Sequence, residues 1–154
     1  MMNELLNSFQ KNTADFLDAL ALFPDRSRTI APDGEWSAAF IVHHVADGEL
    51  HFAARYLHTL GSDNPTMIYF EEERYPAALH YDQRSIAKSL ASIAGIRAMV
   101  FEVLSTVDES AWSRITTSQD GTVFTLIQLV EKANSHLVSH TQQLKELRAK
   151  YLTM

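Results

Sequence analysis

Two histidines one helical turn apart, His136 and His140, are the side chains of this sequence best placed to do chemistry. They lie in a segment, residues 126–147, whose apolar residues recur at helical spacing. Imidazoles at positions i and i+4 project from one face of a helix and can bind the same metal ion. Such a pair by itself more often marks partly buried or surface histidines, so a metal site needs a third ligand from another element.

A second group of histidines lies in residues 36–60, and His44 is the candidate third ligand within it. Gly48 follows His44 by one helical turn and predicts open space for a ligand beside the imidazole. The adjacent His43 points about 100° away from His44 and cannot face the same interior. Asp47 stands at i+4 from His43 and is placed to orient either imidazole by accepting an N–H hydrogen bond.

His44, His51 and His58 are spaced by seven residues and therefore share one face of the predicted helix. A polar face of this kind is either solvated or lines a cleft. His58 lies near the predicted C-terminus of the helix, where the helix dipole favours a partly protonated imidazole, and we interpret it as structural or exposed. His80 has no partner in the sequence and is expected at the surface.

Three neutral imidazoles that leave one or two coordination positions open are typical of a catalytic Zn²⁺ or Ni²⁺ site. A divalent ion bound in this way lowers the pKa of a coordinated water and polarises a substrate carbonyl group. A purely structural zinc site normally uses four protein ligands, often thiolates, and this chain has no cysteine. The absence of cysteine also excludes disulfides and a cysteine nucleophile.

Four long amphipathic helices are predicted to position these residues. Ser37 is the predicted N-cap of the second helix, and Thr122 or Thr125 that of the fourth. Pro24 and Gly61 end the first and second helices. Strand-like alternation is scarce, which favours an all-helical fold. The predicted helices span residues 3–23, 36–60, 82–106 and 122–151, the last beginning at 122 or 123.

The connection between the second and third helices, residues 61–80, is too long for a tight hairpin between antiparallel neighbours. It can cross the bundle, so these two helices can run parallel. We therefore expect an all-α four-helix bundle of up-down-down-up order, with a long crossover between helices two and three. Within the loops we expect a short helical piece at Tyr69–Arg74, a turn of helix from Asp108 to Trp112, and a turn at Asp120-Gly121.

Length and composition indicate one globular domain spanning residues 1–154. The content of 46% hydrophobic and 21% charged residues is ordinary for a soluble protein. A net charge of -6 with scattered Lys and Arg argues against a nucleic-acid partner. The N-terminal segment has no signal-peptide pattern, and no apolar run approaches the ~18 residues needed to span a bilayer. We therefore expect a cytoplasmic protein with no membrane partner.

Several motifs resemble, in their order and spacing, the DinB/YfiT-like proteins. The motifs are Trp36-Ser37, the run from His43 to Asp47, Glu73-Arg74-Tyr75-Pro76, Arg97 in the third helix, Glu109 with Trp112, the helix start Gly121-xx-Phe124-Thr125-Leu126, and the pair His136 and His140. The resemblance covers nearly the whole chain. It implies a four-helix bundle of up-down-down-up order that binds a divalent metal through one histidine of the second helix and an H-xxx-H pair in the last. The chain departs from many relatives at Gly48, where they have a small polar residue.

Carried over residue by residue, the resemblance assigns His44, His136 and His140 as metal ligands, because His44 precedes an aliphatic residue and has Asp47 at i+3. Asp47 and His51 then become the candidate catalytic residues, as proton shuttles or as groups that orient the ligands near the open positions. The metal is expected to be Zn or Ni. The expected partner is a small-molecule substrate, with a low-molecular-weight thiol as one option.

Two classes of function stay open. The resemblance implies a divalent-metal-dependent enzyme, either a hydrolase or isomerase or a thiol transferase. The alternative is a non-catalytic module that binds metal or a small molecule, such as a stress-related binding protein. The non-catalytic module is favoured by the lack of an acidic residue between the two histidines. A HExxH motif carries a glutamate there that acts as general base, whereas this chain has Leu137, Val138 and Ser139.

Self-association is compatible with both classes of function, and we expect a homodimer. The aromatic residues of the long connection either cover such an interface or cap the end of the bundle; they are Tyr69, Phe70, Tyr75 and Tyr81.

Overall fold

The computed structural model describes residues 2–32 and 34–152 of the chain. Four long helices dominate it: α1 (Met2–Ala21), α2 (Ala38–Gly61), α4 (Ile86–Thr106) and α5 (Leu126–Leu152). The shorter elements are the 3₁₀ helices η1 (Asp25–Ser27), η2 (Tyr81–Gln83) and η3 (Glu109–Ser113), the helix α3 (Tyr75–Ala78), and the strands β1 (Ile115–Thr117) and β2 (Val123–Thr125). The predicted four-helix bundle is confirmed.

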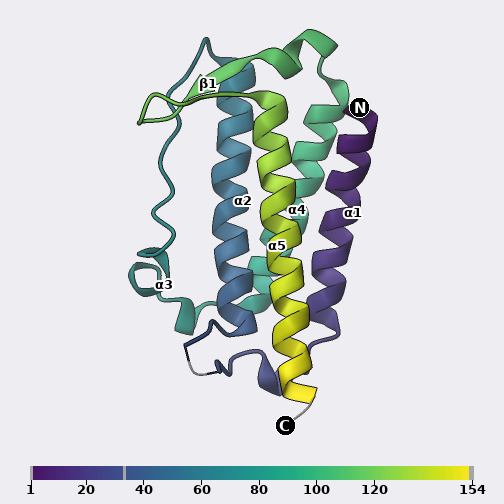
Figure 1. Ribbon diagram of the computed structural model, residues 1–154, viewed down its shortest axis with the longest axis vertical. Coiled ribbons are helices and arrows are strands. Elements are labelled where there is room, and N and C mark those ends of the chain that lie inside the picture. Colours follow the sequence, from purple (N-terminus) through teal and green to yellow (C-terminus); the bar gives the residue numbers. More distant parts are fainter. Residues whose placement is uncertain (1, 33, 153–154) are drawn as a thin grey trace.

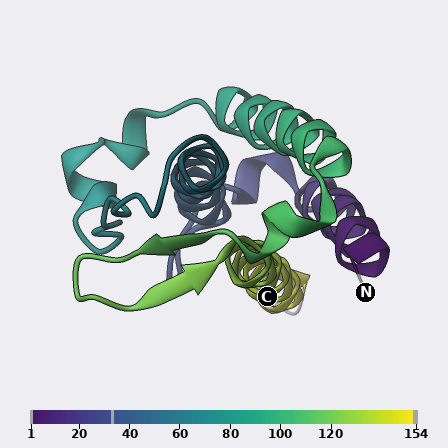
Figure 2. The ribbon, with the colours of Figure 1, turned by 90° about the horizontal axis from the view of Figure 1, so that it is seen from above.

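The helices run along the long axis of the molecule (Figure 1). In that view α1 and α5 descend while α2 and α4 ascend, and the connection after α2 passes down the side of the bundle to α3. Seen from above, α2 lies between α4 and α5, and the connection and the β1–β2 hairpin extend on the same side of the bundle (Figure 2). Of the residues described, no helix is long and apolar enough to cross a membrane.

The helix α2 is the most buried element, because α4, α5 and the connection cover it from three sides. Residues 41–49 are buried without interruption. Four of them are polar or charged and therefore need partners inside the protein; they are His43, His44, Asp47 and Glu49.

Side-chain caps set the starts of two long helices near the predicted residues. The Ser37 hydroxyl accepts a hydrogen bond from the Phe40 N–H at 3.2 Å, as predicted for α2. Thr125, one of the two predicted caps, begins α5 in a capping box: its hydroxyl accepts from the Gln128 N–H at 3.3 Å, and its own N–H donates to the Gln128 side chain at 2.9 Å.

Four predicted boundaries were wrong for local reasons. The helix α5 begins at Leu126 and not at 122 or 123, because residues 123–125 form β2. The helix α4 begins at Ile86 after the N-cap Ser85, because residues 81–83 form a separate 3₁₀ turn. The short helix of the connection is Tyr75–Ala78, later than expected, and its second residue is a proline, which suits a first helical turn. The helix α1 already ends at Ala21, although Phe23 is buried in the core as expected.

The β1–β2 hairpin was not predicted from the sequence. Its strands pair antiparallel, with Thr116 opposite Phe124, and Gly121 takes the positive φ of 86° that its turn requires. Thr117 hydrogen bonds to the connection through Pro65 O at 2.9 Å and Met67 N at 2.8 Å. The hairpin therefore holds the connection against the side of α2 and α5 that carries the histidines.

Candidate metal centre

His44 from α2 and His136 and His140 from α5 converge on one point. The Nε2 atom of His136 lies 3.0 Å from Nε2 of His44 and 3.2 Å from Nε2 of His140. One ligand nitrogen from each ring lies within 4.8 Å of the others. Two nitrogens bound to a tetrahedral Zn²⁺ at ~2.0–2.1 Å lie about 3.3 Å apart, so this spacing suits a shared ion. The three predicted ligands are thus brought together.

The electrostatics of the three rings also suit a metal. Burial lowers the pKa of His44 to about 4 and that of His136 to about 3, with the neighbouring His140 adding to both shifts. Burial lowers the pKa of His140 as well. The rings are therefore neutral near pH 7, which is the state in which imidazole binds a metal.

The hydrogen bonding of the cluster is incomplete without a cation. Each Nε2···Nε2 contact needs one N–H donor and one lone pair. The Nδ1 atoms of His44 and His136 are buried and, among the residues that the structure describes, have no hydrogen-bond partner. A cation at the meeting point would accept all three Nε2 lone pairs and so remove the competition among the Nε2 atoms, although the Nδ1 atoms of His44 and His136 would still have no partner among the described residues.

One ligand has its orientation set by a neighbour on its own helix. The Nδ1 atom of His140 lies 2.8 Å from the side-chain oxygen of Gln143. Its N–H donates to that oxygen, which leaves the Nε2 lone pair free for the cluster. Gln143 was not among the residues predicted from the sequence, although its position at i+3 from His140 is the available signal.

Aromatic packing holds the rings in place. The ring of Phe70 stacks on His44 with centroids 5.6 Å apart, and the Trp36 ring makes an edge contact with His44 at 5.2 Å. The space beside Gly48, predicted to admit a ligand, is filled by His136: a Cβ at position 48 would lie 3.1 Å from its Cε1 atom. The glycine therefore makes room for the candidate ligand His136 and not for a substrate.

Asp47 has different partners from those predicted. Its carboxylate accepts hydrogen bonds from the Tyr81 hydroxyl at 2.7 Å and from Arg84 at 2.8 Å. The Nδ1 atom of His43 lies 2.8 Å from the Ser89 hydroxyl instead. Asp47 thus ties α2 to the residues that precede α4, and its catalytic role stays a prediction.

His51 lies next to the cluster but is separated from it by an aromatic ring. Phe70 stacks on His51 at 4.6 Å on one side and on His44 on the other. The Nε2 atom of His51 is 3.0 Å from the Tyr75 hydroxyl. A catalytic role for His51 therefore stays a prediction. As expected, His58 and His80 are exposed.

A carboxylate that the sequence analysis did not single out lies beside the cluster. The Oε2 atom of Glu72, on the connection, is 3.7 Å from Nε2 of His44, and the side chain is 57% exposed. It is the middle of three successive glutamates, and nothing in the sequence distinguishes it from Glu71 or Glu73. The path of the connection alone brings it to the histidines.

A cleft leads from the cluster to the surface. Its volume of about 650 Å³ is in the range of small-molecule sites. It lies between α2, α5, the hairpin and the connection, and its walls combine aromatic and charged side chains. Its lining includes Phe52, Arg55, Glu72, Phe124, Lys132 and His136.

A four-helix bundle with one buried and two partly buried histidines at the end of a cleft defines a class of helical proteins with a candidate metal site. Residues 8–144 match the model of the DinB superfamily. The chain therefore belongs to the DinB superfamily, as its motifs had indicated.

The comparisons with individual proteins agree with this assignment. A protein of Geobacillus thermodenitrificans (strain NG80-2), provisionally named a metal-dependent hydrolase, is 26% identical over 117 residues, which are 75% of this chain and 66% of that protein. YfiT from Bacillus subtilis, described as a probable metal-dependent hydrolase with an unusual four-helix bundle topology, superposes with a TM-score of 0.89 at 18% identity, covering 97% of this chain and 87% of YfiT. A mycothiol-dependent maleylpyruvate isomerase superposes with a TM-score of 0.76 at 16% identity, covering 94% of this chain and 60% of the isomerase.

Proposed function

We propose that this protein is a divalent-metal-dependent hydrolase that acts on a small molecule, with His44, His136 and His140 as the metal ligands. The observation that carries the proposal is the convergence of three neutral imidazoles at the end of an open cleft. Three protein ligands leave at least one coordination position for a substrate or water, which is the pattern of a catalytic site. Zn or Ni suits nitrogen donors of this kind.

A bound divalent ion would polarise a substrate carbonyl group and lower the pKa of a water or thiol beside it. Glu72 is the group of this chain that would accept the proton from that nucleophile, because its carboxylate lies at the edge of the cluster. Phe70 and Trp36 hold the His44 ring and limit the access of water to its faces. Glu72 thus takes the place of the glutamate that the H-xxx-H pair lacks.

A second candidate reaction is transfer of a low-molecular-weight thiol. It is favoured by the fold shared with a mycothiol-dependent isomerase, and the cleft is large enough for such a co-substrate. The same residues would serve, with Glu72 accepting the proton of a thiol in place of that of water. The homodimer and the cytoplasmic location expected from the sequence stay predictions.

The metal content of the protein tests the ligand set. Tag-free protein is expected to contain about one equivalent of Zn or Ni per chain by elemental mass spectrometry, and His136→Ala is expected to lose it. His58→Ala is the matched control, because His58 is exposed on the same helix as His44. A parent protein that stays metal-free after incubation and washing would contradict the proposal and favour the binding module.

The role of Glu72 tests whether the site is catalytic. Glu72→Gln is expected to keep the metal and to lower the hydrolysis rate by a factor of ~10²–10⁴, measured on a panel of activated esters and amides. Glu73→Gln is the control, since this neighbouring glutamate is also exposed. Equal rates in the parent and in Glu72→Gln would remove Glu72 from the mechanism while leaving the metal site intact.

A further inference from the structure

Arg55 is a half-buried cation that lines the cleft without a carboxylate partner. It lies on the same face of α2 as His44 and Gly48, and its guanidinium carbon lies 5.4 Å from the centroid of the Phe52 ring. Within residues 2–32 and 34–152, no Asp or Glu lies within ion-pair distance of Arg55, and its Nε atom is buried without a hydrogen-bond partner.

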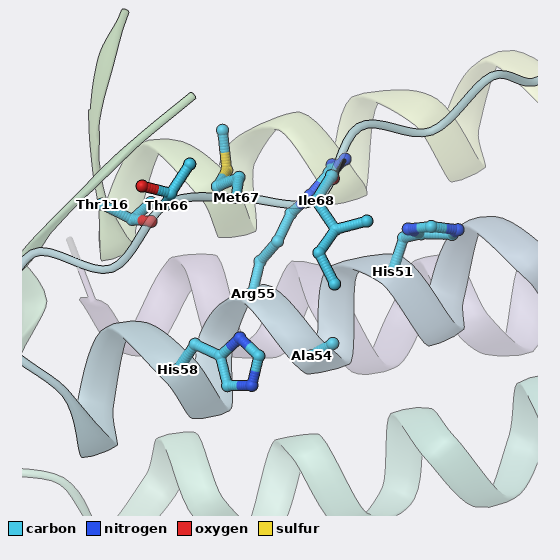
Figure 3. Close-up of a pocket in the computed structure, with 8 residues that line it drawn as sticks. All are labelled: His51, Ala54, Arg55, His58, Thr66, Met67, Ile68 and Thr116. Atoms are coloured by element: carbon cyan, nitrogen blue, oxygen red, sulfur yellow. Dashed lines mark hydrogen bonds between the residues drawn. The ribbon is translucent and has the colours of Figure 1, made fainter. Parts of the chain in front are cut away.

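The contacts of Arg55 within the protein use few of its hydrogen-bond donors. One terminal nitrogen donates to the Ile68 carbonyl at 3.1 Å, and Figure 3 shows the side chain rising from α2 to the segment that contains Ile68. A guanidinium has five N–H donors. A cavity of about 30 Å³ next to Arg55 has room for one water molecule, which would satisfy one more donor but supply no counter-charge.

Two other arginines that are buried or partly buried are neutralised by a carboxylate. Buried Arg97 pairs with Glu49 at 2.8 Å, and partly buried Arg84 pairs with Asp47 at 2.8 Å. Removing a cation from water without such a partner is costly. The fold therefore maintains an uncompensated positive charge at Arg55, on the wall of the cleft that also contains the candidate metal ligands.

A second cation faces the same cleft from α5. Lys132 also lines the cleft, and its Nζ atom lies 5.3 Å from the centroid of Phe124. The acidic residues of the lining have other partners: the Asp120 carboxylate accepts from the Thr122 N–H at 3.0 Å, and Glu72 faces His44. Two cations of the cleft lining, one from α2 and one from α5, thus each lie over an aromatic ring.

The aromatic surface connects the cations to the histidines. The Phe52 ring lies near both Arg55 and His136, with its centroid 5.4 Å from the guanidinium carbon and 5.8 Å from the centroid of the imidazole. An occupant that reaches both His136 and Arg55 must therefore pass along the face of Phe52, which favours an apolar body between its two ends.

We propose that the cleft binds an organic anion whose carboxylate is held by Arg55 and Lys132, whose apolar body lies along Phe52 and Phe124, and whose other end reaches the histidine cluster. A planar guanidinium can bind a carboxylate through two parallel hydrogen bonds, which selects this anion by shape as well as charge. The contact between the other end of the anion and the histidine cluster rests on the proposed function. Recognition of the carboxylate depends on Arg55 and Lys132 alone.

Calorimetric titration of the whole protein with 4-phenylbutyrate and with its uncharged amide tests this inference. In protein freed of metal with a chelator, the acid is expected to bind at least ten times more tightly than the amide. Arg55→Gln should reduce the affinity for the acid to that for the amide and leave the amide unchanged, and Arg55→Lys should restore part of the difference. Arg26→Gln, an exposed arginine on η1, is the control and should bind as the parent does.

Four results would overturn the inference that Arg55 binds a carboxylate. Equal affinities for acid and amide, no measurable binding of the acid to the parent, or a preference for the acid that survives in Arg55→Gln would each exclude carboxylate recognition by Arg55. An equal loss of affinity for the acid and for the amide in Arg55→Gln would show that Arg55 only holds the connection against α2 through its hydrogen bond to Ile68. Zinc binding is measured on the same samples, so an absent metal site with a retained preference for the acid counts against the proposed function alone.

Discussion

Gly48 shows how one missing side chain decides whether the histidines can meet. The Cε1 atom of His136 lies 3.1 Å from where a Cβ at position 48 would be, closer than ordinary van der Waals contact. Phe70 borders the same position at 3.6 Å, so the imidazole has little room to move aside. The close approach of the α5 ligand to α2 therefore depends on a residue without a side chain.

Gly48→Ala is expected to weaken metal binding without unfolding the protein. Alanine favours a helix by up to about 1 kcal/mol over glycine, which offsets part of the strain. The displaced His136 ring should lower the zinc affinity at least tenfold, measured by competition with a chromophoric chelator. Gly95→Ala is the matched control on α4, where a Cβ would meet nothing within 4 Å, and it should keep the parental affinity. Parental affinity in Gly48→Ala would show that the contact is not limiting.

At the scale of elements, the start of α5 links the hairpin to the candidate metal ligands. The strand β2 ends at Thr125 and α5 begins at Leu126, with Thr125 and Gln128 in a reciprocal capping box. The same hairpin hydrogen bonds to the connection that carries Phe70 and Glu72. The walls of the cleft are therefore joined through short elements that the helical periodicity of the sequence does not predict.

Thr125→Ala is expected to lower the free energy of unfolding by about 1 kcal/mol, because the first N–H groups of α5 lose their acceptor. Urea denaturation followed by circular dichroism measures the change. Thr122→Ala is the comparison, since Thr122 was the other predicted cap and is exposed in the turn. It should change the unfolding free energy by less than about 0.5 kcal/mol. Equal effects of the two substitutions would argue against Thr125 as the cap.

At the scale of the whole molecule, one buried network joins the four long helices. Arg97 of α4 pairs with Glu49 of α2 at 2.8 Å and donates to Thr13 of α1 at 2.6 Å and to Asn134 of α5 at 3.2 Å. Burial raises the pKa of Glu49, and the Arg97 charge opposes the shift. The same guanidinium helps to lower the pKa of His136. The bundle core thus sets the charge state of the candidate metal site.

The free energy of unfolding of the metal-free protein is expected to fall as the pH falls from 7.5 to 5. Burial lowers the pKa of His43 and of His44 from 6.5 to about 4, and that of His136 to about 3. Below pH 6.5 the unfolded chain therefore binds protons that the folded protein does not, so stability is complete above pH 6.5 and is lost as the pH falls towards 4. Each unmatched proton contributes about 1.4 kcal/mol per pH unit.

Urea denaturation in the presence of a chelator, at several pH values, measures this dependence. His136→Gln removes one of the titrating groups and should have a shallower slope than the parent. His58→Ala removes an exposed histidine and should keep the parental slope. A parent protein with constant stability between pH 7.5 and 5 would contradict the buried neutral state of these histidines.

Much of the fold could be predicted from the sequence because helical signals are local. Apolar spacing and caps such as Ser37 depend on residues within a few positions of one another, so the four helices were found with boundary errors of a few residues. The hairpin was missed because its strands are three residues long and are held mainly by contact with the connection. Its stability depends on partners distant in sequence, which no local pattern contains.

The sequence by itself determined that His136 and His140 share a helical face and, through the motifs around it, that His44 is the candidate partner. The packed structure is needed to show that His136 fills the space beside Gly48 and that Glu72 faces the cluster. It also shows that Arg55 has no carboxylate partner among residues 2–32 and 34–152. Helical periodicity relates residues that are only a few positions apart in the sequence. The contacts of His136, Glu72 and Arg55 depend instead on where the long connection and α5 pack against α2.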